Sequence, residues 1–289
     1  MNQETIHLLD GKLMTRAIQV LLVGAGGTGS RMLEKLVALH RALRAKGHPF
    51  GLQVLVIDPD TVSPANIGRQ AFYPGDCGSF KCDVLVNRAN MALEDVQWDS
   101  EPAKLDTRSA LDKFDLVIGA VDNRAARLAI LRGLENTVSG TRYWLDTGNR
   151  ESDGQVVIGQ VTSRKRATDD LNRLPHIAEF YPELIDPSAE DKDNTPSCSL
   201  AEALEKQSLF INTTVSDFAA NLLWMLFTEG RLDTQGAFIN LKRMMVTPLR
   251  VDRDVWARFD IVRDGKRHKV VRPSLKAKRL KKQEAAEAA

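Results

Sequence analysis

The chain has 289 residues, 43% of them hydrophobic, and a formal net charge of +2, so it is long enough to bury a full α/β core. It contains no apolar run of about 18 residues and no signal-peptide pattern at its start, so we expect neither a transmembrane helix nor a membrane partner. Its three cysteines, Cys77, Cys82 and Cys198, form no CxxC pair, which argues against a structural zinc site or a disulfide scaffold and favours the cytoplasm.

The charge is unevenly distributed along the chain. Residues 262–289 contain ten Lys and Arg but only three Asp and Glu, whereas the rest of the chain is slightly acidic. We expect residues 1–261 to form the folded domain and residues 262–289 to be a basic, flexible tail. A tail of this kind could also contact nucleic acid.

The first strong elements follow a short lead-in, residues 1–17, that holds a strand or turn near residues 7–11. An apolar strand at residues 20–23 runs into Gly24-Ala25-Gly26-Gly27-Thr28-Gly29, and a helix continues to about residue 46. The glycines permit a tight turn and a close approach of phosphates, and the helix N-terminus faces them with backbone N–H groups. We expect a nucleotide or dinucleotide here, and the turn alone does not say which.

Strands and helices then alternate. This alternation indicates parallel βαβ units, and hence a Rossmann-like, doubly wound α/β sheet that is mainly parallel. The predicted strands are residues 52–57, 114–120 and 143–146, and the predicted helices are residues 82–92 and 123–134.

Three aspartates stand at the predicted carboxyl ends of these strands. They are Asp58, Asp122 and Asp146. Because ligands of parallel sheets bind at the carboxyl ends of the strands, we expect all three to lie at the ligand site.

The second half of the chain changes in character. Residues 162–198 are charged and contain prolines, which predicts a long crossover loop. Residues 200–227 predict one or two helices, and residues 236–251 predict late strands in a C-terminal extension of the sheet.

The segment after the second strand is the most informative. A carboxylate at Asp58 can accept hydrogen bonds from ribose hydroxyls. Asn66, Arg69 and Gln70 follow it, and an arginine near a phosphate supplies charge and a fork of donors. Lys81 adds a second cation that could reach a triphosphate.

Asp122 narrows the choice of nucleotide. It follows the third strand and precedes Asn123, and an aspartate that faces two cations and a phosphate chain suits Mg²⁺. Hydride transfer needs no such carboxylate, so this position favours ATP over NAD.

Taken together, these residues resemble the ubiquitin-activating (E1-like) superfamily, and particularly its bacterial ThiF and MoeB branch. The resemblance covers roughly residues 20–224. It implies an E1-like adenylation domain that uses ATP and Mg²⁺ to adenylate the C-terminal glycine of a small ubiquitin-like protein and releases pyrophosphate. The family also implies a homodimer. The residues that carry the resemblance are Gly24, Gly26, Gly27, Gly29, Asp58, Asp60, Asn66, Arg69, Gln70, Lys81, Asp122 and Asn123.

The resemblance also implies roles for individual residues. Asp58 would hold the ribose, and Asp122 would bind Mg²⁺. Asn66, Arg69 and Lys81 would bind the phosphates and stabilise the charge that develops on transfer, while Gln70 has a supporting role.

Two catalytic assignments and one absence depend on the family pattern alone. Relatives often supply an arginine in trans from an N-terminal segment, and Arg16 is the only arginine in this lead-in. Cys198 occupies the place of a thioester-forming or sulfur-handling cysteine, and the alternative of an ordinary cysteine near a helix start stays open. ThiF and MoeB proteins commonly carry two CxxC pairs for zinc, and this chain has neither, so no zinc is expected.

More narrowly, the chain looks like the ThiF-related member of the ParB-related, ThiF-related cassette (the PRTRC system) of bacterial mobile elements. That resemblance implies a ubiquitin-like partner encoded nearby. Two other functions stay open: an NAD-dependent oxidoreductase built on the same glycine turn, and a non-catalytic adaptor of a plasmid-maintenance system whose basic tail contacts DNA.

Overall fold

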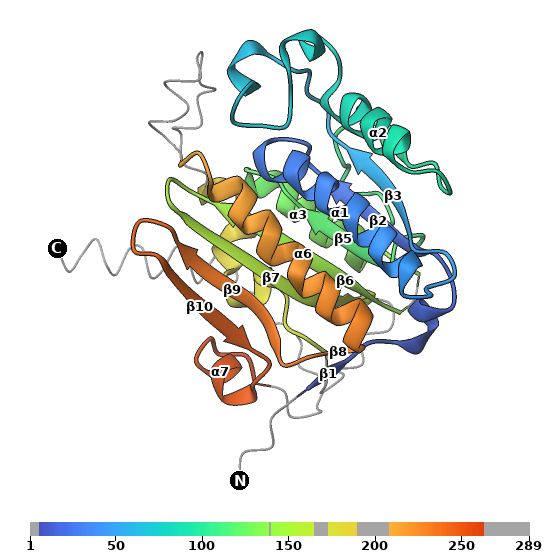
Figure 1. Cartoon of the computed structure of the whole chain (residues 1–289). Helices are drawn as coiled ribbons and strands as arrows, with labels where there is room; N and C mark the ends of the chain where they lie inside the picture. The colour runs from blue at the N-terminus through green and yellow to red at the C-terminus, as the bar shows by residue number, and fades with distance from the viewer. Residues whose placement is uncertain (1–5, 139, 165–172, 190–207, 263–289) are drawn as a thin grey trace, which may run out of the picture.

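The computed structural model describes residues 6–138, 140–164, 173–189 and 208–262. Its centre is an eight-stranded sheet in the order β10-β9-β7-β6-β5-β2-β3-β4 (Figure 1). The strands are β2 (Ile18–Val23), β3 (Leu52–Ile57), β4 (Asp99–Glu101), β5 (Leu116–Gly119), β6 (Thr141–Asn149), β7 (Asp153–Thr162), β9 (Thr234–Asn240) and β10 (Met245–Arg250).

The parallel half of the sheet consists of β4, β3, β2, β5 and β6. In β2, Val20 pairs with Val54 of β3 on one side and with Leu116 of β5 on the other. These residues are almost fully buried, because helices cover both faces of the sheet and only an apolar strand fits between them. The expected Rossmann-like, mainly parallel sheet is therefore confirmed.

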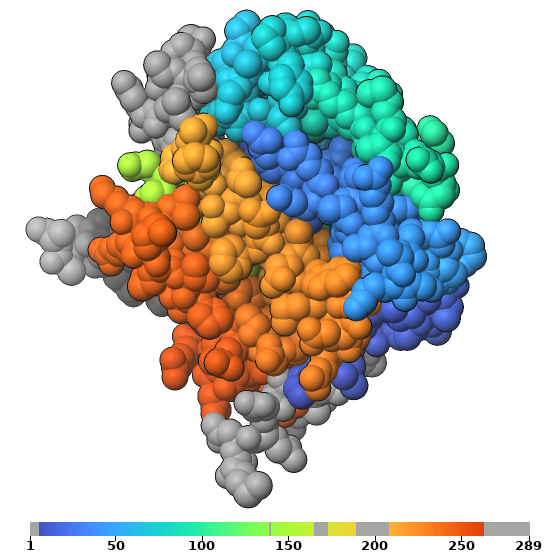
Figure 2. All heavy atoms as spheres, in the orientation of Figure 1, coloured from blue at the N-terminus to red at the C-terminus, as the bar shows by residue number. Residues whose placement is uncertain are grey.

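Helices form the outer layers. Figure 1 shows α1 and α6 side by side across one face of the sheet, with α3 behind it. In the space-filling view α1, α6 and the β9–β10 hairpin form a continuous packed surface on that face (Figure 2). The helices are α1 (Gly27–Ala45), α2 (Lys81–Ala92), α3 (Arg124–Glu135), α4 (Ile177–Phe180), α6 (Ile211–Glu229) and α7 (Arg253–Ala257). No helix of the described ranges is both long and apolar enough to cross a membrane.

Short elements complete the described chain. The lead-in forms β1 (His7–Leu8), which pairs with β8 (Arg231–Leu232) in a separate two-stranded sheet. The 3-10 helices are η1 (Gly11–Met14), η2 (Pro64–Asn66), η3 (Pro74–Asp76), η5 (Pro182–Ile185) and η6 (Pro187–Ala189).

Most predicted elements are present, but one predicted strand is too short and one strand was missed. The strand predicted at residues 143–146 is too short, because β6 extends to Asn149 in an antiparallel ladder with β7. The edge strand β4 was not predicted, because its sequence Asp-Ser-Glu carries no apolar signal. The late strands are confirmed as β9 and β10.

The predicted crossover loop is described only in part. Residues 173–189 form the short helices α4, η5 and η6, whereas residues 165–172 and 190–207 lie outside the described residues. The helix predicted from residue 200 is present from Ile211 as α6, and its predicted start lies outside the described residues.

Candidate functional site

A cleft of about 1510 Å³ opens at the carboxyl edge of the parallel strands. The ends of β2 and β3 and the residue after β5 line it, together with the first turns of α1, α2, α3 and α6. A helix N-terminus presents unpaired N–H groups and partial positive charge, so this arrangement favours an anionic ligand. The volume exceeds the roughly 300–1,000 Å³ of a small-molecule pocket, which leaves room for a nucleotide and part of a second substrate.

The glycine turn between β2 and α1 borders this cleft, and at two of its glycines neighbouring backbone leaves no space for a side chain. Gly24 has a φ of +96°, and a Cβ there would lie 2.5 Å from the carbonyl oxygen of Ala120. A Cβ on Gly29 would overlap the carbonyl oxygen of Gly24. At Gly26, by contrast, a Cβ would meet nothing within 4 Å, so the backbone of this residue is open to the cleft.

Asp58 lies at the end of β3 and braces the glycine turn. Its carboxylate accepts hydrogen bonds from the backbone N–H groups of Ala25 at 2.6 Å and Asp60 at 2.8 Å. Burial raises the pKa of Asp58 above its ordinary value, and the two hydrogen bonds oppose that shift. A carboxylate has about four lone-pair sites, so Asp58 can accept a further hydrogen bond from a ribose hydroxyl.

Lys81 and Asp60 form an ion pair at the edge of the cleft. The Nζ atom of Lys81 lies 3.0 Å from Oδ2 of Asp60. The lysine side chain is 9% exposed and the aspartate side chain is 65% exposed. The buried stem of Lys81, which is the first residue of α2, therefore holds its ammonium at the cleft beside an exposed carboxylate.

The loop that holds Asn66, Arg69 and Gln70 is fixed to its surroundings by hydrogen bonds. Oδ1 of Asn66 accepts from the backbone N–H of Ser63 at 2.9 Å and so closes η2. The N–H of Ala71, directly after Gln70, donates to Oγ of Ser30 on α1 at 3.1 Å. All three predicted residues line the cleft.

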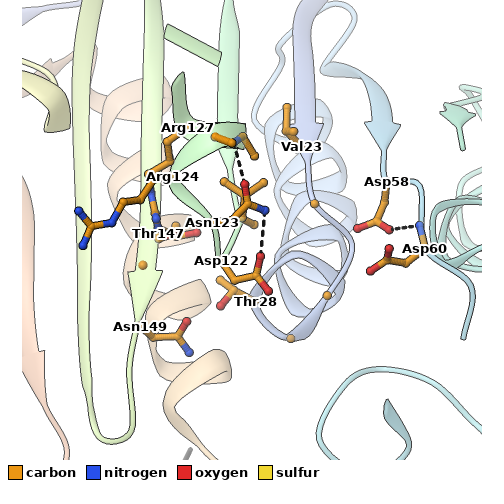
Figure 3. A pocket seen from close by; sticks show the side chains of 18 of the residues that line it. Val23, Thr28, Asp58, Asp60, Asp122, Asn123, Arg124, Arg127, Thr147 and Asn149 are labelled. Carbon is orange, nitrogen blue, oxygen red and sulfur yellow. Dashed lines mark hydrogen bonds between the residues drawn. The ribbon is translucent and has the colours of Figure 1, made fainter. Parts of the chain in front are cut away.

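Arg69 and Asp122 reach the cleft from different elements. Burial lowers the pKa of the Arg69 guanidinium, and the electrostatic interaction with Asp122 raises it. Asp122 follows β5 and is exposed, and Nδ2 of Asn123 donates to its Oδ1 at 3.2 Å. In Figure 3, Asp58 and Asp60 lie on one side of the glycine turn and Asp122 and Asn123 on the other.

Asn123, not Asp122, caps the next helix. Its Oδ1 accepts from the backbone N–H of Ala126 at 2.8 Å in the first turn of α3. An aspartate in front of a helix is often its N-cap, so this role could have fallen to Asp122. The carboxylate of Asp122 therefore faces the cleft and does not cap α3.

Asp146 is not at the ligand edge, and this prediction is wrong. It lies inside β6, opposite Val157 of β7, and is fully buried. Its Oδ1 accepts from Nε of Arg127 at 3.0 Å, in an ion pair whose arginine side chain is 7% exposed. Burial raises the pKa of Asp146, and Arg127 opposes that shift. Thr147 and Asn149, further along β6, line the cleft instead.

Two predicted catalytic residues are not part of the described cleft. Arg16 lies before β2, where its guanidinium pairs with both carboxylate oxygens of Asp115 at 2.6 Å, ahead of β5. This is the amino edge of the sheet, opposite the cleft. Cys198 lies outside the described residues.

The structure adds cleft residues that the sequence did not suggest. They come from α3, the β6–β7 hairpin, the η5 segment, α6 and β9, and no local motif marks them. Only the folded chain brings these residues to the cleft. Among them are Arg124, Arg127, Asn149, Gln155, Tyr181, Asn212 and Phe238.

The donors present fit a magnesium–nucleotide complex. In the described part of the chain, no three His, Cys, Asp or Glu side chains gather closely enough to hold a metal ion by themselves. Mg²⁺ usually binds through one or two carboxylates plus substrate phosphates, so a single exposed Asp122 beside a phosphate-binding turn is a suitable donor set. Bound there, Mg²⁺ would neutralise phosphate charge.

Three similar proteins are named as adenylyltransferases or as a modifier-activating enzyme. The chain is 28% identical over 66% of its length to the adenylyltransferase and sulfurtransferase UBA4 of Candida albicans, of which it spans 38%. It is 30% identical over 52% of its length to the sulfur carrier protein adenylyltransferase of Thermus thermophilus, of which it spans 52%. It is 28% identical over 47% of its length to the ubiquitin-like modifier-activating enzyme 5 of Dictyostelium discoideum, of which it spans 36%. The chain thus spans about half or less of these relatives.

A solved structure and a family model agree with this similarity. The crystal structure of selenomethionine PaaA superposes with a TM-score of 0.53 at 17% identity, over 81% of this chain and 64% of that one, which supports the fold. The ThiF family model matches residues 4–252. That match includes the whole sheet and every residue that lines the cleft, so the chain belongs to the ThiF family.

Proposed function

We propose that this chain is an E1-like adenylyltransferase that activates the C-terminal glycine carboxylate of a small ubiquitin-like protein with ATP. A carboxylate oxygen of the partner attacks the α-phosphorus of ATP, the bond from that phosphorus to the bridging oxygen breaks, and pyrophosphate leaves. The product is an acyl-adenylate. The C-terminal carboxylate is already ionised at neutral pH, so the reaction needs no general base.

One observation carries this proposal: Arg69, Lys81 and Asp122 reach one cleft at the glycine turn. Two cations and helix N-termini suit a triphosphate, and positioning with charge stabilisation is what such a transfer requires. Asp58 would hold the ribose, Asn66 would bind the phosphates together with Arg69 and Lys81, and Gln70 and Asn123 would support the loops around them. The names of the relatives add independent support.

We assign Mg²⁺ to Asp122, since its carboxylate is exposed in the cleft. An NAD-dependent oxidoreductase would leave Asp122 and the ion pair of Lys81 without a role. No zinc is part of the proposal.

The finer assignments are part of the same proposal. We place the chain in the PRTRC cassette and in the cytoplasm, as a homodimer in which Arg16 would act in the neighbouring subunit. Arg16 is bound to Asp115 in the single chain, so that role requires it to leave this ion pair. Transfer of the acyl group to Cys198 is an optional second step.

The first experiment compares ligands by thermal unfolding of the purified chain. Mg·ATP should raise the Tm, by the equivalent of about 2.7 kcal/mol at 100 times its Kd, and NADH should not. Asp122→Ala and Arg69→Ala should each reduce the shift. Asp233→Ala is the matched control, since Asp233 is exposed and does not line the cleft.

Each contrary result has a definite meaning. Stabilisation by NADH alone would overturn the proposal in favour of an oxidoreductase. Wild-type affinity for Mg·ATP in both cleft variants would show that the nucleotide does not use Arg69 and Asp122, and the assignment of the site would fail.

A further inference from the structure

Asn212 occupies a contact point of three elements at the floor of the cleft. It is the second residue of α6, is 2% exposed, and borders the cleft. Its Oδ1 atom accepts hydrogen bonds from Oγ1 of Thr28 at 3.1 Å and from Nδ2 of Asn149 at 2.8 Å. Thr28 belongs to the first turn of α1 and Asn149 is the last residue of β6, so one amide connects the glycine turn with two elements that are remote in sequence.

The amide of Asn212 also packs flat against the glycine turn. A Cβ on Gly27 would lie 2.7 Å from Cγ, Oδ1 and Nδ2 of Asn212. An exposed amide could rotate away from a Cβ at Gly27, but the amide of Asn212 is buried and is held by two hydrogen bonds. The absence of a side chain at Gly27 and the position of Asn212 are therefore a matched pair.

A second contact from α6 reinforces this one. Oγ of Ser216, one turn along the helix, shares its proton between the carbonyl oxygens of Thr28 at 3.1 Å and Asn212 at 2.8 Å, and Ser216 is fully buried. The first turn of α1 is therefore held through the side chain and the carbonyl of Thr28. Both contacts hold backbone that directly follows the open residue Gly26.

We propose that Asn212 is a positioning residue for the nucleotide, because it holds the first turn of α1 in the shape in which its N–H groups meet the phosphates. The inference rests on the proposed function, which places ATP at this turn. Through Asn149, the same amide ties the phosphate end of the cleft to the β6–β7 side. Asn212 touches the turn and not the reacting atoms, so its effect is transmitted through the backbone of Gly27 and Thr28.

The test compares affinities for Mg·ATP and for adenosine by calorimetry on the full chain. Asn212→Ala should raise the Kd for Mg·ATP about tenfold, as expected for the loss of one or two hydrogen bonds, and leave the Kd for adenosine within about twofold. Asn221→Ala, an exposed asparagine on the same helix, is the matched control. A purely structural role would lower the Tm without changing the ratio of the two affinities, and that result would overturn the inference.

Asn212→Asp guards against a variant that fails to fold. It keeps an acceptor for Thr28 and Asn149 and lies in the first turn of α6, where a carboxylate is favoured, so it should fold and still hold the turn. Its Kd for Mg·ATP should therefore be lower than that of Asn212→Ala, and a Kd at least as high as that of Asn212→Ala would overturn the inference. No binding of Mg·ATP by the unaltered chain would instead overturn the proposed function, so the two failures are distinguishable.

A double-mutant cycle needs no ligand at all. Gly27→Ala should lower the Tm of the unaltered chain and should cost much less in an Asn212→Ala background, since the clashing amide is gone. Additive effects would show that Asn212 does not constrain the turn and would overturn the inference.

Discussion

Asp58 braces the fold at the edge of the cleft. Its buried carboxylate holds the backbone N–H groups of Ala25 and Asp60, so it connects the end of β3 to the glycine turn. The ribose-binding role implied by the family stays a prediction. The bracing role follows from the contacts alone and has its own consequence for stability, because the folded state shifts the protonation of this group.

We expect the contribution of Asp58 to stability to fall as the pH rises. Burial raises its pKa in the folded state above the ordinary value of 3.8, so the folded chain binds this proton more tightly than the unfolded chain does. Its contribution is complete below 3.8 and is lost as the pH rises through the raised pKa. Urea unfolding of the unaltered chain and of Asp58→Asn, at steps from about pH 4 to pH 7, should show the stability difference shifting toward the variant.

The sign of this pH dependence is the critical result. A difference that stays constant, or that grows in favour of the unaltered chain, would show that the two hydrogen bonds outweigh burial. Asp233→Asn, at an exposed position, is the control for general effects of pH on the chain.

At the scale of elements, the glycine turn has to meet two requirements: close backbone packing at Gly24 and open space toward the cleft at Gly26. The sequence alone does not show which glycine meets which requirement. Gly24 needs a positive φ and a close approach to Ala120, so it serves the connection between β2 and β5. Gly26 has open space and borders the cleft, so we expect its role to be an approach path for the ligand. Two neighbouring glycines therefore have different physical reasons to be glycine.

Alanine substitutions should separate these two requirements. Gly24→Ala should destabilise the chain by at least about 1–3 kcal/mol, because a positive φ is strained for alanine and the backbone of Ala120 cannot move aside. Gly26→Ala should change stability by less than about 1 kcal/mol and weaken Mg·ATP binding, because its methyl group projects into the cleft. Urea unfolding and ligand titration of both variants would check this, and equal losses of stability would contradict it.

At the scale of the molecule, the cleft is assembled from most of the described chain. It is lined by residues from Val23 to Phe238, so no shorter segment of the chain contains it. The C-terminal strands β9 and β10 extend the sheet beyond β7. Residues 263–289 lie outside the described residues, and the division between a domain at 1–261 and a basic tail at 262–289 stays a prediction.

Removal of residues 263–289 should leave the nucleotide site intact. The shortened chain should show the same rise in Tm with Mg·ATP as the full chain, because it retains all the lining residues found in the described ranges. A lost or weakened shift would show that the tail takes part in the site.

The same pair of chains tests the alternative in which the tail binds DNA. That alternative predicts binding of a DNA duplex by the full chain that weakens steeply with salt and is absent from the shortened chain. Equal binding by both chains would exclude the tail as the DNA contact.

The parallel half of the fold and most of the site could be predicted because their signals are local. Apolar runs at β2, β3 and β5 mark buried strands, and the glycine turn marks the start of α1. Parallel topology then brings the ends of the strands to one edge, which is why Arg69, Lys81 and Asp122 were expected together and do line one cleft.

The remaining features depend on contacts between distant segments, which no local pattern contains. Pairing with β7 lengthened β6 and turned Asp146 from an expected ligand residue into the buried partner of Arg127. Asn212 meets Thr28 across 184 positions of sequence. The sequence by itself thus determined the α/β class and the edge of the sheet at which the cleft opens. Only the tertiary structure decided which polar groups bond to other parts of the protein and which stay exposed in the cleft. The reason is that burial and hydrogen-bond partners exist only after the chain has folded.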